Sequence, residues 1–323
     1  MSGYRLVMLP PQDELTRQWA GRITEALPEV SVVVAETDAE ATAALADAEA
    51  AYGTLSRSQL EAAGRLRWLQ APAAAPPAGY FFDALVEHPV VVTNFRGIYN
   101  DHVATHAVAM VLALARGFPR YVLGQARARW DPIRTAEGVL HLPEATVLVV
   151  GLGGIGSEIA RMMKVFGTRV IATDARVTDG SPLVDEVAPP AELDRLIPEA
   201  DVIVLTVPHT PETEGMIGAR RLSLMKSTAH LVNIGRGMTV RLDDLVQSLE
   251  RGEIAGAGLD VFEVEPLPPD HPLWAMPNVL LTPHVAVAGP YIDERRFAVL
   301  ADNAARFAAG EPLLNVVDKA HWF

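Results

Sequence analysis

The stretch that decides the fold is residues 146–157, which read TVLVVGLGGIGS. A strand-like run leads directly into the turn 151–156, and an apolar pattern of helical spacing follows as far as Phe166. In such a turn Gly151 permits a sharp bend, Gly153 lets the backbone approach a ligand, and Gly156 allows close packing of helix on strand. The order of strand, glycine turn and helix predicts a site for a diphosphate at a helix N-terminus.

The acid that follows this turn favours a particular dinucleotide. Asp174 ends the next predicted strand, eighteen residues after Gly156. A carboxylate there accepts hydrogen bonds from ribose hydroxyls and repels a 2′-phosphate, which favours NAD over NADP. Arg176 can soften that preference, so NADP use stays open. The alternative is an ordinary glycine-rich turn with Asp174 as a helix cap.

Composition excludes several other classes of protein. The 323 residues carry 27 Lys plus Arg against 40 Asp plus Glu, a net charge of −13, and no cysteine. A chain without cysteine has no disulfide, thiolate nucleophile or Cys-bound metal, and its negative charge disfavours nucleic acid as a partner. The longest apolar run, residues 107–115, is far shorter than the roughly 20 residues of a membrane span, and the start lacks a signal-peptide core. A cytoplasmic protein is expected.

Short apolar runs alternate with amphipathic stretches along the chain. This alternation predicts an α/β protein with parallel strands joined by helices. A helix is expected after a cap at Asn100 or Asp101, with its end at Gly117, and a hinge between two domains is expected before it. The expected strands are 5–9, 30–35, 48–52, 66–69, 90–93, 146–150, 169–173, 202–207, 229–234, 257–261 and 279–282.

Three ionisable residues follow three successive predicted strands. They are Arg236, Glu265 and His284. Each alone has an ordinary interpretation, as a surface arginine, part of an acidic loop or a helix cap. Together they lie at the carboxyl edge, where open α/β sheets bind ligands. A guanidinium grips the carboxylate of a 2-oxo acid, an imidazolium donates a proton to its carbonyl oxygen, and a carboxylate orients that imidazole.

Several segments of the chain resemble the D-2-hydroxyacid dehydrogenase family (D-isomer-specific 2-hydroxyacid dehydrogenases). The matching segments are the glycine turn with Asp174, Thr93-Asn94, the helix around His106, and residues 232–237, 256–266 and 278–284. The resemblance implies two doubly wound parallel-sheet domains, a Rossmann cofactor domain (98–287) inserted into a flavodoxin-like substrate-binding domain (1–97 and 288–323). It also implies a homodimer built largely on the cofactor domains, including the helix after Asn100.

The resemblance assigns roles to individual residues. Arg236 matches the substrate-binding arginine, and Glu265 with His284 matches the acid–base pair. Hydride transfer between NAD(H) and a 2-oxo acid/D-2-hydroxy acid pair is the expected reaction. An NADH-sensing protein of the corepressor type, with little or no turnover, is the alternative. The expected cofactor contacts are Gly151, Gly153, Gly154, Ile155, Gly156, Asp174, Thr206, Val207, Pro208, Ile234, Gly235, Arg236, Asp260 and His284.

Two departures from the family pattern affect the expected cleft. The loop that binds the substrate carboxylate through backbone N–H groups reads Ala73-Ala74-Ala75-Pro76-Pro77, in which Ala74 and Ala75 can donate and the prolines cannot. Thr105 stands where the family commonly has glutamate. His102 and His106 have the i, i+4 spacing of a metal pair, but helix packing explains them, so no metal is expected.

Overall fold

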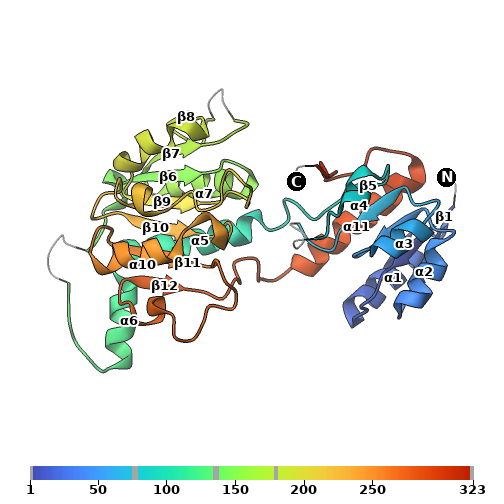
Figure 1. Ribbon diagram of the computed structural model, residues 1–323, viewed down its shortest axis with the longest axis horizontal. Coiled ribbons are helices and arrows are strands. Elements are labelled where there is room, and N and C mark those ends of the chain that lie inside the picture. The colour runs from blue at the N-terminus through green and yellow to red at the C-terminus, as the bar shows by residue number, and fades with distance from the viewer. Residues whose placement is uncertain (1–2, 75–78, 134–137, 178–180, 321–323) are drawn as a thin grey trace. The chain divides into compact units, whose positions relative to one another are not determined.

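The computed structural model describes residues 3–74, 79–133, 138–177 and 181–320. The chain divides into two compact units, residues 1–98 with 290–323, and residues 99–289. Each unit is built on one parallel β-sheet (Figure 1). The prediction of two α/β parallel-sheet domains is confirmed.

The smaller unit holds a five-stranded sheet. Its strand order is β2 (Val30–Val34), β1 (Tyr4–Met8), β3 (Ala50–Tyr52), β4 (Trp68–Gln70) and β5 (Val91–Thr93). Its helices are α1 (Glu14–Ala26), α2 (Asp38–Leu45), α3 (Arg57–Ala62), α4 (Asp83–Glu87) and α11 (Ile292–Ala309). The last of these comes from the far end of the chain and packs against the first strand, where the Tyr4 hydroxyl donates to the Ala304 carbonyl at 2.9 Å.

The larger unit holds a seven-stranded sheet whose strand order reverses beside β6. The order is β12 (Val279–Leu281), β11 (Gly256–Leu259), β10 (His230–Asn233), β9 (Val202–Leu205), β6 (Thr146–Val150), β7 (Arg169–Thr173) and β8 (Glu186–Ala188). Strands to either side of β6 are reached by connections in opposite directions, and ligands bind at such a switch point. The edge strand β8 was not predicted, because only three residues pair there.

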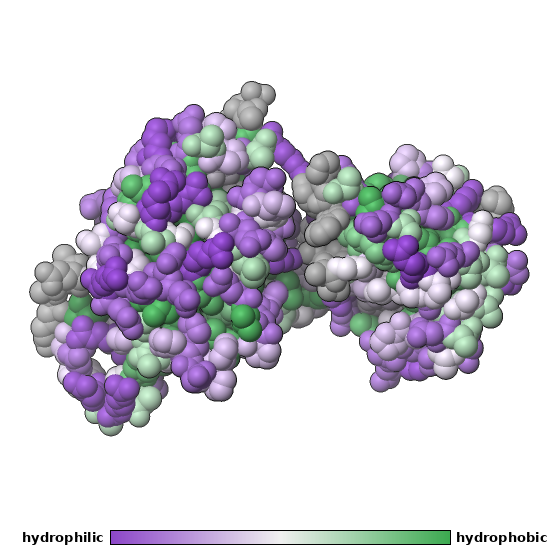
Figure 2. Space-filling model, viewed as in Figure 1, coloured by the Kyte–Doolittle hydropathy of each residue, from purple (hydrophilic) through white to green (hydrophobic). Residues whose placement is uncertain are grey.

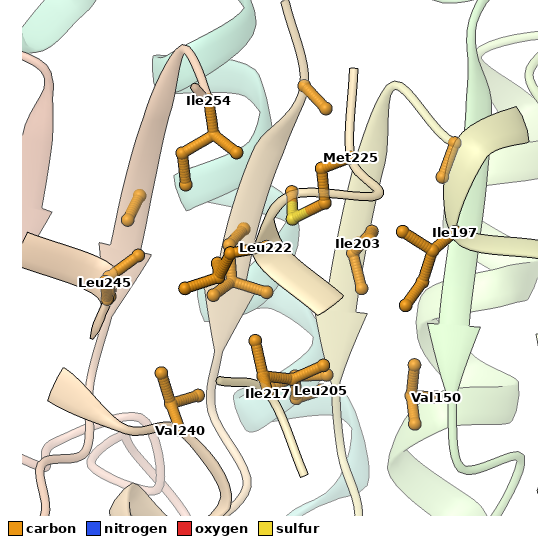
Figure 3. Close-up of a cluster of buried hydrophobic side chains, with 14 of the residues drawn as sticks. Val150, Ile197, Ile203, Leu205, Ile217, Leu222, Met225, Val240, Leu245 and Ile254 are labelled. Atoms are coloured by element: carbon orange, nitrogen blue, oxygen red, sulfur yellow. The ribbon is translucent and has the colours of Figure 1, made fainter. Parts of the chain in front are cut away.

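Helices cover both faces of this sheet. They are α5 (Asn100–Ala115), α6 (Phe118–Ala126), α7 (Gly154–Val165), α8 (Leu193–Leu196), α9 (Ala219–Leu222) and α10 (Leu242–Glu250). Short 3₁₀ turns lie at Leu142–Glu144, Pro190–Glu192, Ile197–Glu199, Gly237–Thr239 and Pro272–Ala275. Leu222 and Leu245, from α9 and α10, pack on one face of the sheet among side chains such as Ile203 and Leu205 (Figure 3).

The expected cap of the helix that starts the larger unit is wrong. Helix α5 begins at Asn100, and the preceding Tyr99 makes no side-chain cap bond. Asn100 is the first helical residue, and its amide lies against Gly154, where a Cβ would come within 2.4 Å of Nδ2. The expected end is confirmed, since Gly117 adopts a left-handed φ of +66°.

Polar residues dominate the visible face of the larger unit (Figure 2). Among the described residues, no single helix is long and apolar enough to cross a membrane. Helices α5 and α6 taken together have the length and apolar composition of a membrane span, but the chain bends by 76° between them.

Buried His230 makes stability depend on pH. Its Nδ1 is buried without a hydrogen-bond partner among the described residues, and burial lowers its pKa to about 4. An unfolded chain protonates this imidazole near pH 6.5, so protonation favours unfolding. We expect the free energy of unfolding to fall as the pH drops from about 6.5 to 4, by up to roughly 3 kcal/mol.

Urea unfolding at several pH values measures this effect. His230→Leu removes the titrating group, so its stability should depend less on pH in that window than wild type. His141→Gln changes a histidine whose side chain is 70% exposed and serves as control. An unchanged pH dependence in His230→Leu would contradict the prediction.

Candidate active site

The glycine turn after β6 is built from backbone contacts that exclude side chains. Gly151 has a φ of +96°, and a Cβ on Gly156 would lie 1.9 Å from the Gly151 carbonyl oxygen. A Cβ on Gly153, by contrast, would meet no atom within 4 Å. Gly156 therefore packs directly on the backbone of Gly151, while Gly153 leaves room for a ligand at the N-terminus of α7.

Asp174 ties this turn to the end of β7. One carboxylate oxygen accepts from the Leu152 N–H at 2.6 Å, and the other accepts from Arg176 and Val177 at 2.7 and 3.0 Å. Partial burial raises the pKa of the Asp174 carboxyl, but these three N–H donors outweigh burial and hold the pKa below its usual value. Asp174 is thus an anion beside the glycine turn.

The segments after β9 and β10 complete this edge of the sheet. The Thr206 hydroxyl donates toward the Gly151 carbonyl at 2.7 Å, which joins the end of β9 to the glycine turn. After β10, Asn233 Oδ1 accepts from the Gly235 N–H at 3.1 Å. A Cβ on Gly235 would lie 2.7 Å from the Val207 carbonyl oxygen, so the two segments touch.

Arg236 follows directly and is partly buried. Its Nη1 donates to the Gly235 carbonyl at 2.7 Å. Burial lowers the pKa of the guanidinium, and nearby Glu265 opposes that shift. A Cβ on Gly237 would overlap the Phe262 carbonyl at 1.8 Å, so the exit of β10 packs directly on the exit of β11. This contact brings Arg236 into the electrostatic field of Glu265.

Glu265 and His284 form a hydrogen-bonded pair. His284 Nδ1 lies 2.8 Å from Glu265 Oε2, and Glu265 Oε1 accepts from the Phe262 N–H at 2.9 Å. Because an ionised carboxylate only accepts hydrogen bonds, Nδ1 carries the proton in this pair. The second ring nitrogen, Nε2, is left to act on another molecule, and the side chain is 46% exposed.

Asp260, expected to contact the cofactor, has a carboxylate engaged within the protein. Its side chain is 1% exposed and accepts from the Thr282 hydroxyl and from the N–H groups of Val285 and Ala286. Sequence reasoning missed Thr282 and left His106 to helix packing. The signal available was the position of Thr282, two residues before His284 in the same strand exit.

The predicted substrate loop belongs to the smaller unit. The Ala74 carbonyl accepts from Asn94 Nδ2 at 2.8 Å, which tethers the loop to the end of β5. Ala75, Pro76 and Pro77 lie outside the described residues.

The histidines on α5 have separate surroundings. His102 Nδ1 lies 3.0 Å from Asp101 Oδ1, and His106 Nε2 lies 2.9 Å from the Thr282 hydroxyl. Within the described ranges, no three His, Cys, Asp or Glu side chains gather as metal ligands.

Comparison with known proteins defines the class. Residues 108–286 match the model of the "D-isomer specific 2-hydroxyacid dehydrogenase, NAD binding domain". A glyoxylate reductase of Korarchaeum cryptofilum is 39% identical over 71% of this chain and 70% of its own length. A glycerate dehydrogenase of Methylorubrum extorquens is 35% identical over 71% of this chain and 72% of its own.

A solved structure agrees over the full length. A D-isomer specific 2-hydroxyacid dehydrogenase from Xanthobacter autotrophicus Py2, in complex with NADPH and MES, is 29% identical, covers 100% of both chains and has a TM-score of 0.84. The chain belongs to the D-isomer specific 2-hydroxyacid dehydrogenase family. It is an NAD(P)-dependent oxidoreductase of 2-hydroxy acids, and its larger unit contains the NAD-binding domain.

Proposed function

We propose that this enzyme transfers hydride between NAD(H) and a 2-oxo acid/D-2-hydroxy acid pair, with Arg236, Glu265 and His284 as its catalytic residues. The observation that carries the proposal is the 2.8 Å bond between His284 Nδ1 and Glu265 Oε2, which leaves Nε2 for the substrate. The larger unit is the cofactor domain and the smaller unit binds substrate. A small 2-oxo acid such as glyoxylate is the first candidate, by analogy with the glyoxylate reductase relative.

In the reductive direction each residue has a defined task. Arg236 holds the substrate carboxylate through two parallel hydrogen bonds. NADH, when bound, supplies the hydride to the carbonyl carbon. Charge then develops on the carbonyl oxygen, and His284 Nε2 donates a proton to it. Glu265 keeps the imidazole oriented and stabilises its protonated form. The reverse reaction returns the proton to Nε2.

The residues of the glycine turn suit a dinucleotide. The open space at Gly153 and the N-terminus of α7 would receive the diphosphate, with Gly154, Ile155, Thr206, Val207, Pro208, Ile234 and Gly235 along the same edge.

The function is tested by NADH consumption with glyoxylate and with the 2-oxo acids that correspond to glycerate and lactate. With the best of these substrates, Arg236→Ala should lower kcat/KM by about 100-fold or more, because a charge-assisted bidentate contact is lost in the transition state. Steady-state kinetics at fixed NADH provides the measurement.

Arg220→Ala is the matched control, because Arg220 is 69% exposed and pairs with Asp194. It should keep the wild-type kcat/KM. Equal values for Arg236→Ala and wild type would remove Arg236 as the anchor. Tight NADH binding by folded protein without consumption of any substrate would contradict the proposed reaction and favour an NADH sensor.

Asp174 should set the preference for NADH over NADPH. Its carboxylate is held ionised beside the glycine turn, where it would meet the ribose of a bound dinucleotide. In Asp174→Ala we expect the ratio of kcat/KM for NADH to that for NADPH to fall about 10-fold, as expected for removal of one like-charge repulsion.

Parallel assays with the two cofactors give this ratio directly. Asp194→Asn removes a carboxylate that is paired with Arg220 and Arg221, and its ratio should stay at the wild-type value. An unchanged ratio in Asp174→Ala would show that other groups select the cofactor.

We also expect a homodimer that uses α6. Phe118, Tyr121 and Val122 are spaced as neighbours on one helical face, yet they are 56%, 37% and 61% exposed. An exposed apolar stripe of this kind marks an interaction surface, and we propose a second copy of the chain as its partner. Val122→Arg should shift the mass measured by light scattering from two chains toward one.

Val165→Arg is the matched control, because Val165 is 77% exposed at the end of α7. This variant should retain the mass of two chains. A wild-type protein with the mass of a single chain would contradict the proposed dimer.

A further inference from the structure

The buried carboxylate of Asp260 holds the segment that carries His284. The Asp260 carbonyl accepts from the His284 N–H at 2.8 Å. Its carboxylate oxygens accept from the next two N–H groups, Val285 at 2.9 Å and Ala286 at 3.0 Å. Three successive backbone groups are thus bonded to one residue at the end of β11.

This support matters because the His284 backbone is strained. Its φ of +53° lies in the left-handed region, which a residue with a Cβ adopts only where its surroundings compensate. The bonds to Asp260 supply that compensation on the backbone, while Glu265 holds the ring through Nδ1. The position of Asp260 therefore sets the position of the backbone to which the His284 imidazole is attached.

The Asp260 carboxylate is in turn held by two further side chains. The Thr282 hydroxyl donates to Asp260 Oδ1 at 2.6 Å. His106, from the middle of α5, has its Nε2 2.9 Å from the Thr282 oxygen and 3.6 Å from Asp260 Oδ1. A hydroxyl has one proton, and an ionised carboxylate can only accept it. His106 Nε2 must therefore donate to Thr282, which gives a directional chain from His106 through Thr282 to Asp260.

We infer that His106 and Thr282 are positioning residues for the acid–base step. They act through Asp260, which connects helix α5 to the strand exit that presents His284. Neither side chain needs to touch the substrate or the cofactor for this role. The inference rests on the proposed function, because it assumes that His284 exchanges the proton. It also gives His106 a task that the spacing of His102 and His106 does not reveal.

The test compares Thr282→Val with Thr282→Ser, and His106→Leu with His106→Gln. Valine and leucine remove the hydrogen-bonding groups, whereas serine keeps the hydroxyl and glutamine keeps an N–H donor. We expect kcat with glyoxylate, or with a better 2-oxo acid, to fall about 10- to 100-fold in Thr282→Val and His106→Leu. The KM for the 2-oxo acid and the Kd for NADH, from fluorescence titration, should change far less than kcat. Serine and glutamine should restore most of the lost kcat.

Thr168→Val is the matched control. Thr168 is also buried, and its hydroxyl donates to the Met163 carbonyl at 2.9 Å, outside the Asp260 network. Its kcat should equal that of wild type. Wild-type kcat in both Thr282→Val and His106→Leu would overturn the inference. So would an equal loss in Thr282→Ser and Thr282→Val, or a loss explained entirely by weaker NADH binding.

His284→Asn separates this inference from the proposed function. If His284→Asn turns over as fast as wild type, the acid–base assignment itself is wrong. If His284→Asn is inactive while Thr282→Val and His106→Leu are fully active, only the positioning role is wrong.

Discussion

The larger unit depends on backbone contacts that leave no room for a Cβ at the carboxyl edge of its sheet. Gly156 meets the Gly151 carbonyl in this way, and Gly237 meets the Phe262 carbonyl. Parallel strands run in the same direction, so their carboxyl ends and the segments that follow them lie at one edge of the sheet. Glycine at these positions lets the exits of neighbouring strands pack together. That packing positions the glycine turn, Arg236 and the Glu265–His284 pair.

Much of this fold was predictable because its signals are local. The strands 146–150 and 169–173 were predicted with the bounds that the structure shows, since buried parallel strands are continuous apolar runs. Strand β8 is an edge strand of three residues and carries no such run. The cap of α5 was mispredicted: Asn100 is already the first helical residue, and its amide lies against Gly154, fifty-four residues away in the chain. Contacts between distant segments override a local capping preference.

The candidate site shows the same division between local and distant information. The positions of Arg236, Glu265 and His284 after three strands indicated a shared edge, and the structure pairs Glu265 with His284. The bonding of the Asp260 carboxylate was not predictable, because its partners lie on a different strand exit and are mostly backbone N–H groups. His106 reaches the same network from 176 residues away. Spacing along a helix shows which face a side chain occupies, but not what lies opposite it.

The late position of α11 in the chain affects how the protein is made. This helix supplies Leu300 and Ala304 to the core of the smaller unit, and its Phe307 ring packs on Tyr4 with 4.8 Å between centroids. The five strands of that unit are synthesised first, yet their sheet lacks this cover until nearly the whole chain has emerged from the ribosome. The larger unit, continuous in sequence, can fold earlier. During synthesis the strands of the smaller unit therefore keep apolar surface exposed until α11 has been made.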